Sequence, residues 1–285
     1  MSVLLAGMAS ALLGCGDFFA GVGGRRTGHP GAATAIAWVA SLIGGIVAGV
    51  YVLVFQPKAF NVDDLLWTLA AVLFFSLARP LLYLGMERGP MSTFAPVIGV
   101  VGLVVPALVG PLTGQALTGL ESLGVLVAVP AVVLVVAEGE FPSIVSVRHS
   151  PGLGLGVITG VLIGATSLCF GQIDPDAGAM PAFVVQAGAV LLIPLVARTF
   201  RPMAPMRAEV LRFGLLVGLV DAGAIIGSVI AYQRGNVAVV AAIIGFAPVV
   251  TITLAWRVFG EKVWRWQWVG AGLATVSILL FAAAV

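Results

Sequence analysis

Three ionisable side chains lie deep inside otherwise apolar stretches of the sequence: Asp17, Arg79 and Asp221. A charge at the centre of a bilayer costs about 2.5–3.5 kcal/mol even on the mildest scale, so such residues face a cavity or an oppositely charged partner. An arginine binds a carboxylate, a phosphate or another anion, whereas an aspartate binds an amino group or carries a coupling proton. The alternative interpretation is a structural ion pair or triad that holds helices together.

The positions of these charges within their apolar segments indicate which of them meet. Asp17 lies about four residues before the end of a segment at 3–21, and Arg79 lies about seven residues before the end of a segment at 64–86. At 1.5 Å per residue the two depths differ by only roughly 5 Å, which the long arginine side chain can bridge. Asp17 is the closer of the two to the membrane–water interface.

Five further side chains in the apolar segments are candidates for contact with a substrate. Tyr83 and Tyr232 lie at matching ends of their segments. There they either line the mouth of a cavity or anchor the helices at the membrane interface, where Tyr is enriched, and anchoring is the favoured interpretation. The remaining candidates are Gln186, Ser228 and Trp38.

Other kinds of site find no support in the sequence. His29 and His149 lie in connecting loops, and no Cys/His cluster has the spacing of metal ligands. Cys15 and Cys169 lie inside apolar stretches and predict no disulfide. The carboxylates are scattered, no ATP-binding motif occurs, and a net charge of +2 is too small to indicate nucleic acid. We therefore expect no metal, no cofactor, no nucleic-acid partner and no enzymatic activity.

The composition predicts that the lipid bilayer surrounds most of the chain. Of 285 residues, 60% are hydrophobic and only 9% are charged, against about 25% charged in soluble domains. A helix needs about 20 mostly apolar residues to cross the hydrocarbon core. Ten segments meet that length: 3–21, 31–54, 64–86, 91–113, 119–137, 152–171, 180–199, 209–231, 236–257 and 265–284. We therefore expect an all-α integral membrane protein of ten transmembrane helices.

The ten segments divide into two halves of five that resemble each other. At a constant offset of 146 residues, Arg88-Gly89 corresponds to Arg234-Gly235, and other matches follow in the same register. The longest loop, around 138–150, separates a first repeat at 1–140 from a second repeat at 150–285. Because five helices is an odd number, the second half enters the membrane from the opposite side, which makes an inverted repeat.

An inverted repeat is a recurrent plan of secondary transporters, whose substrate site lies at the bilayer midplane between the halves. At the offset of 146, Asp221 corresponds to position 75, one helical turn from Arg79. We therefore expect Arg79 and Asp221 to face one central cavity from opposite halves.

Ten helices place both termini on one side of the membrane, and the distribution of Lys and Arg predicts which side. The loops after the odd-numbered segments hold eleven of these residues, whereas the opposite loops hold only Lys58 and Arg234. By the positive-inside rule the first set of loops is cytoplasmic. Both termini are then expected on the outer side.

Small residues and one proline mark where helices pack or bend. Glycines recur every fourth residue in two segments: Gly152, Gly156, Gly160 and Gly164, and again Gly214 and Gly218. This spacing lets another helix approach closely, and static packing is favoured over a sliding surface. Pro248 removes a backbone donor inside the ninth segment and predicts a kink there.

The last three segments carry short motifs in a fixed order: Tyr232-Gln233-Arg234-Gly235, Ala247-Pro248, Phe259-Gly260-Glu261-Lys262 and Gly270-Ala271-Gly272. Their order and spacing resemble those of the EamA-type transporters of the drug/metabolite transporter superfamily. The stretch from Leu13 to Gly21 resembles the first helix of a bacterial subgroup of that family. Two features depart from the family pattern: Gln115 stands where a glutamate would mirror Glu261, and family members are often drawn with cytoplasmic termini, opposite to the charge count.

The resemblance implies a secondary transporter in the bacterial inner (plasma) membrane. Such a protein exports or exchanges amino acids, other small metabolites or drug-like compounds by alternating access. The substrate, the direction of transport, the coupling ion, for which H⁺ is the candidate, and the oligomeric state stay open. A membrane channel and a non-transporting membrane scaffold are the alternative interpretations; a channel conducts without saturation, whereas a carrier saturates and exchanges.

Overall fold

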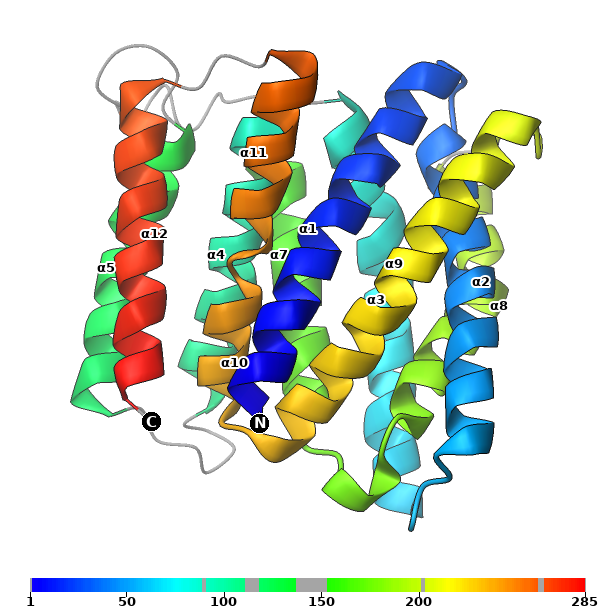
Figure 1. Ribbon diagram of the computed structural model, residues 1–285, viewed down its shortest axis with the longest axis horizontal. Helices are drawn as coiled ribbons and strands as arrows, with labels where there is room; N and C mark the ends of the chain where they lie inside the picture. Colours follow the sequence, from blue (N-terminus) through cyan, green and yellow to red (C-terminus); the bar gives the residue numbers. More distant parts are fainter. Residues whose placement is uncertain are drawn as a thin grey trace.

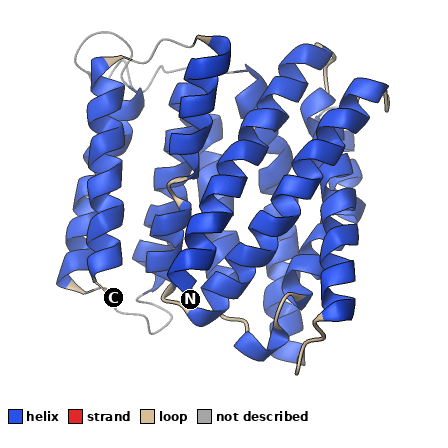
Figure 2. Ribbon diagram, viewed as in Figure 1, coloured by secondary structure: helices blue, strands red, loops and turns tan. Residues whose placement is uncertain are grey.

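The computed structural model of the chain describes residues 2–88, 91–110, 118–136, 153–200, 203–260 and 264–284. Within those ranges every regular element is helical (Figure 2). The elements are α1 (Ser2–Thr27), α2 (Ala32–Val54), α3 (Val62–Arg88), α4 (Met91–Val109), α5 (Gly119–Val136), α7 (Leu153–Phe170), η2 (Pro175–Ala177), α8 (Met180–Phe200), α9 (Ala208–Arg234), α10 (Val237–Ile244), α11 (Ala247–Phe259) and α12 (Arg265–Ala283). The predicted boundary loop around 138–150, Gln115 and Glu261 lie outside the described residues.

The observed helices lie where the apolar segments predict them, and several are long and apolar enough to cross a membrane. In the described part of the chain, seven spans combine sufficient length with high hydropathy and few charges. The arrangement of ten helices as two inverted halves of five stays a prediction.

The first helix is longer than the sequence predicts. The apolar segment ends near residue 21, yet α1 continues to Thr27 and stops where Gly28 adopts a φ of +60°. Gly23 and Gly24 stay helical because other side chains pack on them: a Cβ on Gly23 would lie 2.7 Å from the Phe213 ring, and one on Gly24 would lie 2.9 Å from Glu87. The consequence is that Asp17 lies well inside α1 and not near its end.

The ninth predicted segment is two helices, because the chain turns at Gly245 and Phe246 between α10 and α11. Pro248 has no backbone N–H, so the carbonyl of Ile244, four residues earlier, has no helical donor. The Ser10 hydroxyl of α1 donates to that carbonyl at 3.2 Å. The predicted kink is therefore a full break whose exposed carbonyl is satisfied by the neighbouring helix.

The helices cross one another in a single bundle (Figure 1). The helix α1 packs along α9, and α2 packs against both α8 and α9. The helix α7 packs along α3 and α4, and α8 also contacts α3. The helices α5 and α12 stand side by side at one edge, where they meet the rest of the bundle through α4 and α10.

Glycines make the closest helix contacts, as their spacing predicts. In α7, a Cβ on Gly160 would lie 2.6 Å from the Val101 Cβ of α4, and one on Gly164 would lie 2.6 Å from the Val105 Cβ. In α9, a Cβ on Gly218 would lie 2.8 Å from the Ala40 carbonyl of α2. Since only a residue without a side chain permits these distances, the four-residue repeat serves tight packing.

At the side of the membrane where α1 begins and α12 ends (Figure 1), two connecting segments are tied together. Asn61 and Asp64 cap the start of α3 by bonding each other's backbone N–H, at 2.9 and 3.0 Å. The other oxygen of Asp64 accepts from the backbone N–H of Asp174 at 2.9 Å. This carboxylate, only 3% exposed, thus joins the α2–α3 connection to the α7–α8 connection.

Candidate functional site

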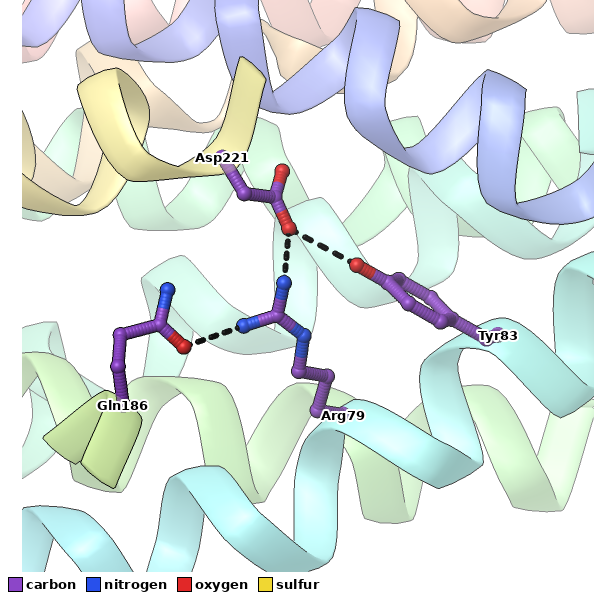
Figure 3. A network of polar contacts seen from close by, with 4 residues as sticks. All are labelled: Arg79, Tyr83, Gln186 and Asp221. Atoms are coloured by element: carbon purple, nitrogen blue, oxygen red, sulfur yellow. Dashed lines mark hydrogen bonds and ion pairs between the residues drawn. The ribbon is translucent and has the colours of Figure 1, made fainter. Parts of the chain in front are cut away.

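Arg79 lies at the centre of a buried polar network formed by three helices (Figure 3). Its Nη1 donates to Oε1 of Gln186, on α8, at 2.8 Å. Its Nη2 forms an ion pair with Oδ2 of Asp221, on α9. The hydroxyl of Tyr83, one turn after Arg79 on α3, donates to the same Oδ2 atom at 2.8 Å. All four residues are at most 4% exposed.

Aromatic rings on α3 flank the guanidinium. The Cζ atom of Arg79 lies 5.1 Å from the centre of the Phe75 ring and 5.6 Å from that of the Tyr83 ring. Residues 75, 79 and 83 are four apart and therefore share one face of the helix. Cation–π attraction to both rings stabilises the charge where water is excluded. Phe75 was not among the predicted site residues, although its four-residue spacing from Arg79 is a signal that would have identified it.

A cavity of about 150 Å³ adjoins this network, and residues of both predicted halves line it. Asp17, Arg79, Tyr83 and Asp221 are on its wall, together with Ser228. The rest of the wall is mostly aliphatic and aromatic: Leu13, Phe75, Ala78, Leu82, Met86, Ala95, Ile98, Gly99, Gly102, Ile163, Thr166, Ser167, Phe170, Ile225, Tyr232, Ala241, Ile244, Gly245, Ala247 and Pro248. A small apolar cavity with a few convergent polar groups is the usual form of a small-molecule site.

Several polar atoms at the cavity are buried without a hydrogen-bond partner among the described residues. They are Nε of Arg79, Oδ1 of Asp221 and Oγ of Ser228. Buried polar atoms are nearly always paired in folded proteins, and leaving one unpaired costs free energy. Each of these atoms belongs to a residue of the cavity wall, so the wall carries polar groups whose hydrogen bonding is incomplete.

Two glycines allow neighbouring helices to approach the network. A Cβ on Gly16 of α1 would collide with Oδ1 of Asp221 and would lie 3.3 Å from the Cγ atom of that residue. A Cβ on Gly44 of α2 would collide with Nε2 of Gln186 and would lie 2.9 Å from the Cδ atom of that residue. The backbones of α1 and α2 thus fix the positions of two side chains that contact Arg79.

The structure brings most of the predicted residues to one place. The predicted meeting of Arg79 and Asp221 is confirmed by their ion pair, and Gln186 contacts Arg79 directly. Asp17 and Ser228 lie on the cavity wall. No hydrogen bond or ion pair joins Asp17 to another described side chain, and it shares the cavity with the ion pair.

The favoured interpretation of the two tyrosines, anchoring at the membrane interface, is wrong. Tyr83 and Tyr232 are 1% and 4% exposed and lie on the cavity wall. The reason is that both side chains find partners inside the bundle: the Tyr83 hydroxyl donates to Asp221, and the Tyr232 ring packs against Phe170 with ring centres 6.4 Å apart.

Trp38 is also placed differently from the prediction. It is absent from the cavity wall, because its indole Nε1 points to α8 and donates to the carbonyl of Val190 at 3.0 Å. Trp38 therefore joins α2 to α8 and is not part of the site. In the part of the chain that the structure describes, no group of three or more His, Cys, Asp and Glu side chains is placed to hold a metal ion.

The chain is similar to a family of known proteins in sequence and to a solved structure in fold. Residues 150–283 match the family model described as "EamA-like transporter family". A solved structure titled "Crystal structure of protein" superimposes with a TM-score of 0.70 and 17% sequence identity, covering 98% of this chain and 96% of its own. That likeness shows a common fold. No curated protein matches the chain.

Proposed function

Since this chain belongs, through its second half, to the EamA-like transporter family of the drug/metabolite transporter superfamily, we propose that it is a secondary transporter. It moves small metabolites, such as amino acids or drug-like compounds, across the bacterial inner membrane by alternating access, as an exporter or exchanger. Its family is a transporter family, and its apolar helices make it a multi-pass membrane protein. The substrate occupies the cavity beside Arg79 and Asp221.

The observation that carries this proposal is the buried ion pair between Arg79 and Asp221 at the wall of a cavity. Charged side chains inside a membrane are costly, and they are typical of substrate and ion pathways. A pair that served only to hold two helices would not require a cavity, nor atoms without partners such as Oδ1 of Asp221. Secondary transporters built from repeats place their site between the halves, and Arg79 and Asp221 belong to the first and the second proposed half.

The inverted repeat of ten helices, with halves at 1–140 and 150–285, is part of the proposal and is supported by how the helices pack. If α1, α2 and α3 correspond to α7, α8 and α9, the contact of α1 with α9 corresponds to that of α7 with α3. In the same way, the contact of α2 with α9 corresponds to that of α8 with α3. The contact of α7 with α4 has its counterpart in that of α1 with α10 and α11.

Each polar residue of the site has a role in this proposal. Asp221 and Arg79 respond to the charge of the substrate, while Tyr83 and Gln186 hold them in place. Asp17, Ser228 and Tyr232 contact the substrate from the cavity wall. Coupling to H⁺ would use Asp221 as the proton carrier.

Counterflow in proteoliposomes tests the proposal with a panel of amino acids and small organic ions. Wild type is compared with Asp221→Asn and with the matched control Asp176→Asn, which removes a half-exposed carboxylate of η2 that is absent from the cavity wall. We expect saturable exchange of one class of compound in wild type and the control, and its loss in Asp221→Asn. A proton gradient applied to the same vesicles tests the coupling role.

Three other results have clear meanings. Exchange that persists in Asp221→Asn would mean that the protein is a carrier in which Asp221 has a structural role. Flux that rises without saturation favours a channel. If no compound in a broad panel moves, the proposal of transport is contradicted in favour of a scaffold.

A further inference from the structure

The cavity wall carries more acidic groups than basic ones among the described residues. It holds two carboxyl groups, those of Asp17 and Asp221, and one guanidinium, that of Arg79. Arg79 is paired with Asp221, which leaves the carboxyl group of Asp17 without an ionic partner. We infer that the cavity binds a small organic cation with an apolar body, whose ammonium group is held by Asp17. This inference rests on the proposed function of the same site and names the class of its substrate.

Arg79 is poorly placed to receive an anion. Its Nη1 and Nη2 atoms are engaged by Gln186 and Asp221, and two aromatic rings flank the group. A carboxylate bound at one of the remaining N–H groups of Arg79 would lie in a cavity that already contains the two carboxyl groups of Asp17 and Asp221. Repulsion between like charges is strong where water is excluded. An anionic ligand is therefore disfavoured, although Arg79 by itself would attract one.

The acceptor groups of the cavity wall fit an ammonium group. An ammonium group has three donors and no acceptor. The cavity wall carries the carboxyl groups of Asp17 and Asp221 and the hydroxyl of Ser228. All three accept hydrogen bonds, and the two carboxylates also supply negative charge.

The rest of the wall fits an apolar body of limited size. Phe75, Phe170 and Tyr232 provide aromatic rings, and Leu13, Leu82 and Ile98 provide aliphatic surface. Aromatic faces attract cations as well as apolar groups. The volume of about 150 Å³ equals that of a cavity known to accommodate benzene. We therefore expect a ligand of about five to seven non-hydrogen atoms.

Binding of three ligands of nearly equal shape tests this inference: isobutylammonium, isobutanol and isobutyrate. Each is titrated at pH 8 into the full-length protein in lipid nanodiscs, and binding is measured by calorimetry. We expect isobutylammonium to bind at least tenfold more tightly than either of the others. In Asp17→Asn its affinity should fall by roughly tenfold, the effect of losing one charge-assisted hydrogen bond. Asp17→Glu should keep most of the affinity, and Asp176→Asn should keep all of it.

The opposing results are equally specific. Tighter binding of isobutyrate or isobutanol overturns the assignment to cations, and an unchanged affinity in Asp17→Asn overturns the role of Asp17. The ligand comparison in wild type holds even if Asp17→Asn fails to fold, which size-exclusion chromatography reveals. Exchange of anions or neutral compounds in the counterflow assay would support the proposed transport function and contradict a cationic substrate. Selective binding of isobutylammonium without any counterflow would support a cation site and contradict the proposed transport function.

Discussion

Asp221 uses its two oxygens differently. Both Arg79 and Tyr83 contact Oδ2, whereas Oδ1 has no hydrogen-bond partner among the described residues. One oxygen thus holds α9 against α3, and the other lies against the backbone of α1 at Gly16. A cation bound beside Asp221 would compete for the charge that holds Arg79, so ligand binding and the contact between α3 and α9 are linked through one carboxylate.

Tyr83→Phe tests the contribution of the hydroxyl at this carboxylate. The substitution keeps the ring that flanks Arg79 but removes the hydrogen bond to Oδ2. A hydrogen bond to a charged group contributes about 1.5–3 kcal/mol. We expect transport by counterflow to fall roughly tenfold or more, with no loss of folded protein on size exclusion. A wild-type rate would mean that Asp221 is held without Tyr83.

Gly16→Ala tests the same carboxylate without changing any charge. The added Cβ would collide with Oδ1 of Asp221, so the carboxylate must leave its present position. We expect ligand affinity and transport to fall several-fold. Gly7→Ala is the control on the same helix, because no atom lies within 4 Å of its added Cβ. Equal behaviour of the two variants would contradict a role for this close approach.

The sequence predicts the meeting of Arg79 and Asp221 because both lie in the middle of long apolar segments, where depth and repeat register are well defined. It fails for Tyr83 and Tyr232, since a tyrosine near the end of a segment has the same sequence pattern whether it faces the interface or a cavity. Asp17 is deeper than expected because α1 continues for six residues after the predicted end at 21. Hydropathy cannot detect that extension, which depends on packing against Gly23 and Gly24.

At the level of helices, the break between α10 and α11 faces the cavity. Ile244, Gly245 and Pro248 all lie on its wall. The sequence predicts a kink at Pro248, but the full break also depends on Ser10, on a different helix, which bonds the released carbonyl. Contacts between distant segments of this kind are not visible in a local pattern.

Gly160→Ala tests whether the glycine repeat of α7 serves packing. The new methyl group would lie 2.6 Å from the Val101 Cβ, so α4 and α7 must separate. Overpacking of this kind costs about 1–3 kcal/mol, and we expect a lower thermal stability in detergent. Gly154→Ala, with no atom within 4 Å of its Cβ, should be unchanged or slightly stabilised, as alanine favours helix. A stable Gly160→Ala protein would instead fit a surface along which the helices slide.

At the level of the whole molecule, α1 begins and α12 ends on the same side of the bundle (Figure 1). The excess of Lys and Arg in the opposite loops predicts that this side faces outward. Alkaline phosphatase fused to the C-terminus should therefore be active, and green fluorescent protein at the same position should be dark. The reverse pattern would show that both termini are cytoplasmic, as family members are often drawn.

The ion pair also has a consequence for the biogenesis of the protein. Arg79 is in α3, which ends at Arg88, whereas Asp221 is in α9, which begins at Ala208. About 120 residues separate the two helices, and at 5–20 residues per second their synthesis takes on the order of ten seconds. Throughout that interval a newly inserted α3 carries a charge in the bilayer without its carboxylate. The nascent chain must therefore be protected at Arg79, by water, lipid headgroups or the insertion machinery, until the second half arrives.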